Sequence, residues 1–250
     1  MQHRWHVIQP NRVLAIVALA MTSLVGAACG SSGPTLGSLS GLTAQQALQL
    51  ALHNARQAKT LSFTVKTQAT GFQQSVQGDA GPAGGDVTVT SPAGVLRIIV
   101  VGGMGYVESD VGGLEAALGL SSTAAGAGAD KWIAIPPASP HYADLTRATS
   151  FDSTLGEFTP GGTLELTDTN IAGRSVGLIE GIGTATVKVQ SYQVQMAVST
   201  RKPILPIGGG VTVKANGNTS MQAAVFSLWG RTLNLSAPAG AIPLASISST

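Results

Sequence analysis

The feature that most constrains the fold of this chain is an apolar–polar alternation of period two, which starts near residue 60 and returns toward the C-terminus. The apolar positions are Phe63/Val65/Thr67/Ala69, Val87/Val89, Leu96/Ile98/Val100, Leu164/Leu166, Val187/Val189 and Tyr192/Val194/Met196/Val198. Successive side chains of a strand point to opposite faces, so this pattern predicts strands with one buried face and one solvent-exposed face. Such strands are typical of antiparallel sheets.

Turn signals and a final apolar pair complete the predicted strand set. Gly102-Gly103 and Asn216-Gly217 each separate two β-rich runs, which predicts tight hairpins. Leu233 and Leu235 predict a last short strand. We expect about ten strands in all, mostly joined by short turns.

Helical patterns are few. Thr43 and Gln46 form a capping-box pair ahead of an alanine-rich apolar stripe, so a helix is predicted from there to about Lys59. Shorter helices are expected at Leu114–Leu120, Ala143–Arg147 and Asp152–Phe158, and a small-residue loop at Ser121–Ala129. No linker divides the chain, so we predict one α+β, mainly β, domain over residues 43–250.

The first 28 residues have the organisation of a secretory signal peptide. Arg4 and Arg12 precede the uncharged, largely apolar run Val13–Val25, and the small residues Gly26-Ala27-Ala28 follow. This run is shorter than the ~20 residues that a comfortable membrane span needs. An uncleaved short anchor is the alternative interpretation.

The only cysteine, Cys29, stands at the predicted cleavage site. Val25–Cys29 resembles the bacterial lipobox, in which the thiol is acylated and becomes the first mature residue; Gly26 departs from the usual Leu. Ordinary signal-peptidase cleavage with a free thiol is the alternative. The Gly/Ser-rich residues that follow favour acylation, because residues 29–42 would form a flexible tether from a diacylglyceryl- and palmitate-bearing Cys29 to the domain.

Charge excludes a nucleic-acid binder. The chain has 14 Lys+Arg against 12 Asp+Glu, and Arg4 and Arg12 are the only charged residues before Cys29. The mature chain is therefore balanced at 12 against 12, and no basic stripe with interleaved aromatic residues is present.

Catalytic and metal-binding patterns are also missing. His53 and His141 are the only histidines after Cys29, the acids are scattered, and no phosphate-binding or dinucleotide fingerprint occurs. Gly173–Gly177 (GRSVG) fits the G-x-S-x-G nucleophile pattern, but that pattern needs a preceding strand and a following helix. Here a turn-like run precedes it and a strand-like run follows, so we predict a hairpin connection and no enzymatic activity, cofactor or metal.

The order of these features resembles actinobacterial envelope lipoproteins of the LppX/LprA/LprF/LprG type, which share a fold with LolA-like carriers. The resemblance runs over most of Cys29–Ile247. The segments that carry it are Gly94–Val101 with the Gly102-Gly103 turn, Lys131–Pro136 (KWIAIP), Val225–Gly230 (VFSLWG) and Leu233–Pro238 (LNLSAP).

This resemblance implies a curved antiparallel half-barrel whose concave face is covered by the N-terminal helix and the short helices, with an apolar cavity for acyl chains of lipids or glycolipids. The inward-facing candidates for that cavity are Val65, Leu96, Ile98, Val100, Val189, Val194 and Met196; plain core packing is the alternative for each.

Two functions follow as hypotheses. The first is a lipid-binding or lipid-carrying lipoprotein, held on the extracytoplasmic side of the cell membrane through Cys29, with an envelope transport partner. The second is a scaffold or sensor lipoprotein of the envelope whose core is filled.

Overall fold

The fold was established from a computed structural model, which describes residues 37–182, 191–215 and 218–248. The strands are β1 (Leu61–Ala69), β2 (Phe72–Gly81), β3 (Gly84–Ser91), β4 (Gly94–Val101), β5 (Met104–Ser109), β6 (Ile133–Ile135), β7 (Gly161–Ile171), β8 (Arg174–Ile182), β9 (Ser191–Ser199), β10 (Pro206–Ala215), β11 (Asn218–Ser227) and β12 (Ile242–Pro243). The helices are the 3-10 turn η1 (Gly37–Leu39) and α1 (Ala44–Ala58), α2 (Val111–Leu118), α3 (Ser122–Gly128), α4 (Tyr142–Ala148), α5 (Phe151–Glu157) and α6 (Leu244–Ser248).

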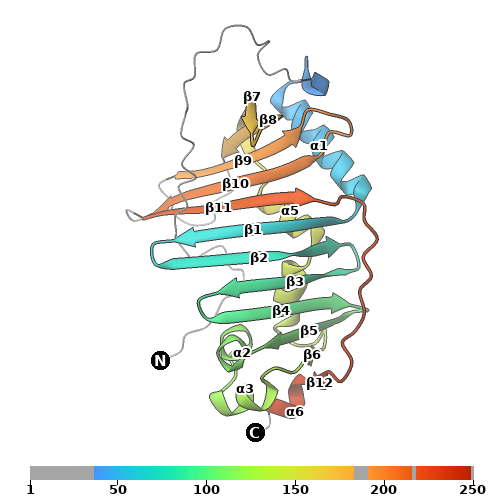
Figure 1. The fold of residues 1–250 in the computed structure, drawn as a ribbon, viewed down its shortest axis with the longest axis vertical. Helices are drawn as coiled ribbons and strands as arrows, with labels where there is room; N and C mark the ends of the chain where they lie inside the picture. The colour runs from blue at the N-terminus through green and yellow to red at the C-terminus, as the bar shows by residue number, and fades with distance from the viewer. Residues whose placement is uncertain (1–36, 183–190, 216–217, 249–250) are drawn as a thin grey trace.

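The described strands form one 12-stranded sheet in the order β12-β6-β5-β4-β3-β2-β1-β11-β10-β9-β8-β7. Every neighbouring pair is antiparallel except β12 and β6, which run parallel. The sheet is open, with β7 at one edge and β12 at the other (Figure 1). The chain therefore is α+β and mainly β, as the alternation predicts.

The two faces of the sheet differ in what covers them. On the helix-covered face, α1 contacts β7 and β10, α5 contacts β2, and α4 contacts β4 and β5. Figure 1 shows α4 and α5 behind the strands, and α2, α3 and α6 gathered at the β12 end. Apolar side chains at alternate positions point to this face and form one core cluster with the helices. The opposite, open face carries the intervening polar positions, such as the cross-strand pair Arg97 and Glu108.

The first helix begins and ends as its sequence predicts. The Gln46 backbone N–H donates to Thr43 Oγ1 at 3.2 Å, and the Thr43 backbone N–H donates to Gln46 Oε1 at 2.9 Å. Together these bonds form the predicted capping box. Lys59 ends the helix in the left-handed conformation, with φ of 67°. The buried stripe Ala47/Leu48/Ala51/Leu52/Ala55 lies against the sheet.

One close approach seats α5 on the sheet. Phe158 follows α5 directly, is fully buried, and stacks edge-on against Phe226 of β11 with ring centroids 5.8 Å apart. Beside it on β10, a Cβ added to Gly209 would lie 2.7 Å from Phe158 Cβ. The absence of a side chain at Gly209 therefore lets the end of α5 pack directly on the strands.

Three predicted elements differ from the structure. Ser121–Ala129 is not a loop, because Ser121 caps a helix by accepting a hydrogen bond from the Ala124 N–H, and α3 follows. Strand β2 was not among the expected strands, because its glutamines, serine and glycines hide the alternation. Leu233 and Leu235 form no strand, since both edges of β11 are already paired, with β1 and β10.

Residues 228–241 instead form a strap that leaves β11 and runs past the ends of β1–β5 to reach β12 (Figure 1). Thr60 fastens its start: the Gly230 N–H donates to Thr60 O at 3.0 Å, and the Thr60 hydroxyl donates to Arg231 O at 2.7 Å. At the far end, the Ile242 N–H donates to Trp132 O at 2.8 Å.

The expected tether, residues 29–42, is shorter than predicted at its C-terminal end. Leu39 is fully buried, and the Ser38 N–H donates to Thr200 O at 3.0 Å. Residues 37–42 therefore belong to the packed domain. The signal peptide, Cys29 and the rest of the tether lie outside the described residues.

Candidate functional site

The predicted cavity residues share one face but line no void. Val65, Leu96, Ile98, Val100, Val194 and Met196 all lie on the helix-covered face, and none is more than 7% exposed. A space wide enough for an acyl chain would leave the side chains around it accessible. These six residues are therefore core, which corrects the expectation that they line a cavity; Val189 lies outside the described residues.

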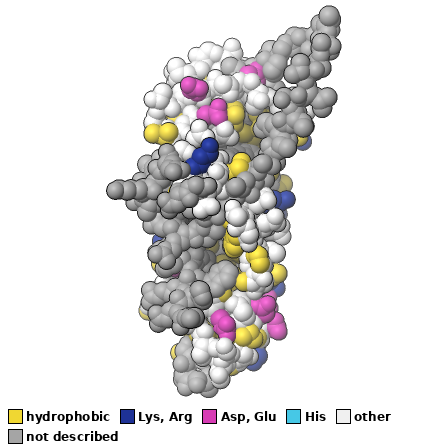
Figure 2. Space-filling model, turned by 90° about the vertical axis from the view of Figure 1, so that its left-hand side faces the viewer, with side chains coloured by type: hydrophobic (Ala, Val, Ile, Leu, Met, Phe, Trp, Pro, Cys, Tyr) yellow, Lys and Arg dark blue, Asp and Glu magenta, His cyan; other side chains and the backbone are white. Residues whose placement is uncertain are grey.

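A different part of the helix-covered face is less tightly covered. At the strand ends marked by the β1–β2 and β10–β11 turns, Leu164, Tyr192 and Val213 are only half-buried against the core. Val213 pairs with Tyr192 across β10 and β9, and Leu164 lies against Gly181, the cross-strand partner of Val194. Figure 2 looks onto these strand ends and shows hydrophobic side chains at the surface over the length of the sheet.

Glu157, the last residue of α5, lies at this end of the face. The side chain of Gln222 on β11 hydrogen-bonds its carboxylate, and Gln222 occupies the helix-covered face between Thr67 and Val211. We call the group Glu157, Gln222, Tyr192, Val213 and Leu164 the strand-end cluster. It combines apolar side chains with a few polar groups, which is the composition of ligand sites.

The environment of Glu157 differs from that of a free surface carboxyl. The side chain is exposed to solvent, yet desolvation by the surrounding protein raises the pKa of its carboxyl, and the Gln222 hydrogen bond opposes the rise.

Tyr192 has a related environment. Burial raises the pKa of its phenol, and the negative charge of Glu157 raises it further. The phenol therefore stays protonated at neutral pH and can donate a hydrogen bond.

This cluster was not predicted from the sequence. Gln222 was the available signal, because it interrupts the inward-facing positions Ser220/Gln222/Ala224/Phe226 of β11 with a long polar side chain. Glu157 could not be found in that way, since only the packing of Phe158 decides where the end of α5 lies.

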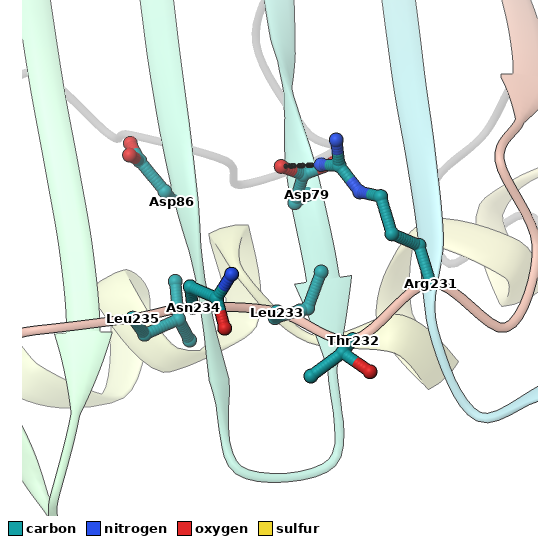
Figure 3. Close-up of a pocket in the computed structure, with 7 residues that line it drawn as sticks. All are labelled: Asp79, Asp86, Arg231, Thr232, Leu233, Asn234 and Leu235. Atoms are coloured by element: carbon teal, nitrogen blue, oxygen red, sulfur yellow. Dashed lines mark hydrogen bonds and ion pairs between the residues drawn. The ribbon is translucent and has the colours of Figure 1, made fainter.

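A pocket lies on the open face, where the strap crosses β2 and β3 (Figure 3). It has a volume of about 360 Å³ and is lined by Asp79, Asp86 and residues 231–235. Asp79 and Asp86 are cross-strand partners, and Arg231 of the strap forms an ion pair with Asp79, which also accepts a hydrogen bond from Ser62.

The charged residues of this pocket hold the strap against the sheet. Burial raises the pKa of Asp86 most, Asp79 adds to the rise, and the Arg97 guanidinium opposes it. Leu233 covers Gly81 next to the ion pair. Because Arg231 already neutralises Asp79, we interpret the pocket as the place where the C-terminal strap is held to the sheet.

The G-x-S-x-G match is a hairpin, as predicted. Strand β7 ends at Ile171 and β8 begins at Arg174, so Ser175 lies inside a strand and no helix follows it. The Ser175 hydroxyl donates to Asp168 Oδ1 at 3.1 Å across the hairpin. No nucleophile elbow is formed.

Histidines and metal ligands do not assemble in the part of the chain that the structure describes. His53 is exposed on α1, and His141 is half-buried ahead of α4. No three His, Cys, Asp or Glu side chains among the described residues are placed to share a metal ion. Within the same residues, no helix is both long and apolar enough to cross a bilayer.

Comparisons with known proteins give no assignment. No protein-family model matches the chain, and no curated protein matches it. Among solved structures, an uncharacterized conserved protein from Thermus thermophilus is similar at 11% identity and a TM-score of 0.41, over 80% of this chain and 97% of that one. A similarity of this degree supports no statement about function.

Proposed function

We propose that this chain is an envelope lipoprotein, anchored through acylated Cys29 on the extracytoplasmic side of the cell membrane, whose domain binds acyl chains of lipids or glycolipids without catalysing a reaction. The observation that carries the proposal is the strand-end cluster, where Leu164, Tyr192 and Val213 are only half-buried on a face that is otherwise packed, and the exposed Glu157 lies near Tyr192. Perturbed titratable groups next to incompletely buried apolar side chains are typical of ligand sites.

The lipobox-like junction and the one-sided helix layer support the same proposal. A half-barrel of the LppX/LprG type, with its transport role and envelope partner, is the finer form of the proposal. It places the bound chain at the strand ends, since the centre of the helix-covered face is occupied by core side chains.

The test is to measure lipid bound by full-length protein carrying Cys29→Ser, which cannot be acylated. We expect native mass spectrometry and organic extraction to find near-stoichiometric lipid. Val213→Trp, which adds bulk at the strand-end cluster, should reduce the extracted lipid severalfold. Val225→Trp is the matched control, because Val225 lies on the neighbouring strand, faces the opposite side and is 61% exposed.

The second candidate function is the scaffold or sensor with a filled core. The near-complete burial of Ile98 and Met196, both 0% exposed, favours it. Protein that is repeatedly free of lipid, with no difference between Val213→Trp and Val225→Trp, would establish this function over the carrier.

A further inference from the structure

The pocket beside the strap is separate from the strand-end cluster and lies on the opposite face of the sheet. We propose that this pocket binds a small hydroxylated amine, whose ammonium pairs with Asp86 and whose hydroxyl groups bond to Arg231 and Asn234. This inference goes beyond the proposed function, because it concerns a different face and a ligand without an acyl chain.

The first observation is a cavity between two distant parts of the chain. Residues 231–235 of the strap cross the open face, and Asp79 and Asp86 form the sheet side of the space (Figure 3). Its volume of about 360 Å³ falls in the range of roughly 300–1,000 Å³ that small-molecule sites have. The hydrogen bonds of Thr60 with the Gly230 N–H and with Arg231 O hold the strap side of the pocket in place.

The second observation is the charge that the pocket presents. Asp79 is neutralised by its ion pair with Arg231, whereas Asp86 forms no hydrogen bond or ion pair with any residue that the structure describes. Arg97 on the neighbouring strand also attracts Asp86, but its guanidinium is already paired with Glu108 at 2.6 Å. One carboxylate therefore remains to accept hydrogen bonds from a ligand ammonium.

The third observation is the set of hydrogen-bonding groups beside this carboxylate. Figure 3 shows the Asn234 amide between Asp86 and the Asp79–Arg231 pair. One guanidinium nitrogen of Arg231 donates to Asp79, and neither its other N–H groups nor the Asn234 amide bonds to a described residue. An amide both donates and accepts, and a guanidinium donates only. Hydroxyl groups complement both, so the pocket favours a hydroxylated amine over a plain alkylamine.

The pocket is remote from the two internal gaps in the described residues. Ile182, the last described residue before 183–190, is aligned through the cross-strand pairs of β9, β10 and β11 with Gln68 near the end of β1. Asp79 pairs instead with Ser62 near the start of β1. These positions differ by about 20 Å along the strands. The described residues 215 and 218 lie at the same end as Gln68.

The test compares glucosamine, glucose and cyclohexylamine by isothermal titration calorimetry at pH 6.5, with full-length protein carrying Cys29→Ser. Glucose has a hydroxyl where glucosamine has its ammonium, and cyclohexylamine has the ammonium on a six-membered ring without hydroxyls. We expect glucosamine to bind at least about tenfold more tightly than either, since it engages Asp86 and the strap groups together.

Two variants and a control locate the binding. Asp86→Asn removes the charge with little change in shape and should weaken glucosamine binding about tenfold, and glucose binding much less. Asn234→Ala should weaken glucosamine binding about threefold without a change in Tm, because Asn234 is exposed. The control Glu165→Gln removes the same charge from β7 at the edge of the sheet and should change nothing. Circular dichroism melting verifies that each variant is folded.

Equal affinities for glucosamine and glucose, or equal losses in Asp86→Asn and Glu165→Gln, overturn the pairing of the ammonium with Asp86. Cyclohexylamine that binds as tightly as glucosamine overturns the role of the strap groups. Absence of saturable glucosamine binding overturns the site itself. The proposed function fails separately, in the lipid extraction described above, where Asp86→Asn should yield as much lipid as its parent.

Discussion

Replacing Gly209 with alanine tests how α5 is seated on the sheet. The added Cβ would lie 2.7 Å from Phe158 Cβ and 3.0 Å from both Phe158 Cδ1 and Gln195 O. Real Cβ atoms do not approach carbon this closely, and Phe158 Cβ cannot retreat without moving the end of α5. The neighbouring Gly210 is the matched control, because a Cβ there points to the open face and meets nothing closer than 3.5 Å.

The expected magnitude follows from two opposing effects. An alanine in place of a strand glycine relieves about 0.5–1 kcal/mol of backbone entropy, and both variants gain it. Gly209→Ala also incurs an overpacking cost of about 1–3 kcal/mol. The two variants should therefore differ by about 2 kcal/mol, with Gly210→Ala the more stable.

Thermal unfolding measures this difference. For a domain of this size, 2 kcal/mol corresponds to a difference in Tm of about 4–8 °C between the two variants. Equal melting temperatures, or a higher one for Gly209→Ala, would refute the reasoning that Gly209 is needed for Phe158 to pack against β10.

Four further predictions concern the leader, Glu157, the hairpin and the first helix. Cys29→Ala should move the protein from the membrane fraction to the soluble or unprocessed pool on fractionation, and wild-type protein that is wholly soluble after processing would contradict the lipobox. Because the pKa of Glu157 is raised in the folded protein, its contribution to stability is present below its ordinary pKa and is lost as the pH rises through the raised value. In urea titrations, Glu157→Gln should therefore raise the free energy of unfolding relative to wild type more at pH 7 than at pH 4. An equal effect at both pH values would contradict this. Ser175→Ala should leave any esterase signal at background, and a wild-type signal lost in the variant would contradict the hairpin interpretation. Thr43→Ala should cost about 1 kcal/mol in the same urea titrations through loss of the capping box, and an unchanged unfolding midpoint would contradict its role.

The elements with strong local signals were predictable. Thr43 and Gln46 mark the start of α1, and the alternation around Val65, Ile98 and Met196 places these side chains on the buried face where the structure has them. Elements with weak local signals were not predicted. The polar composition of β2 conceals a central strand, and the glycines of α3 suggest a loop.

The candidate site could not be predicted from the sequence for a related reason. Alternation shows which side chains point inward, but it does not show which inward positions a helix then covers. Val194 lies under the helix layer and is core, whereas Tyr192 on the same face of the same strand is half-buried beside Glu157.

The sequence by itself determined the strands with a clear alternation, their buried positions, the cap of α1 and the charge balance, because each depends on neighbours along the chain. Only the tertiary structure decided that Leu233 and Leu235 form a strap rather than a strand, that the expected cavity residues are core, and that Glu157 lies near Gln222 and Tyr192. These outcomes depend on which strand edges are already paired and on how closely Phe158 approaches Gly209, and both are contacts between residues far apart in the chain.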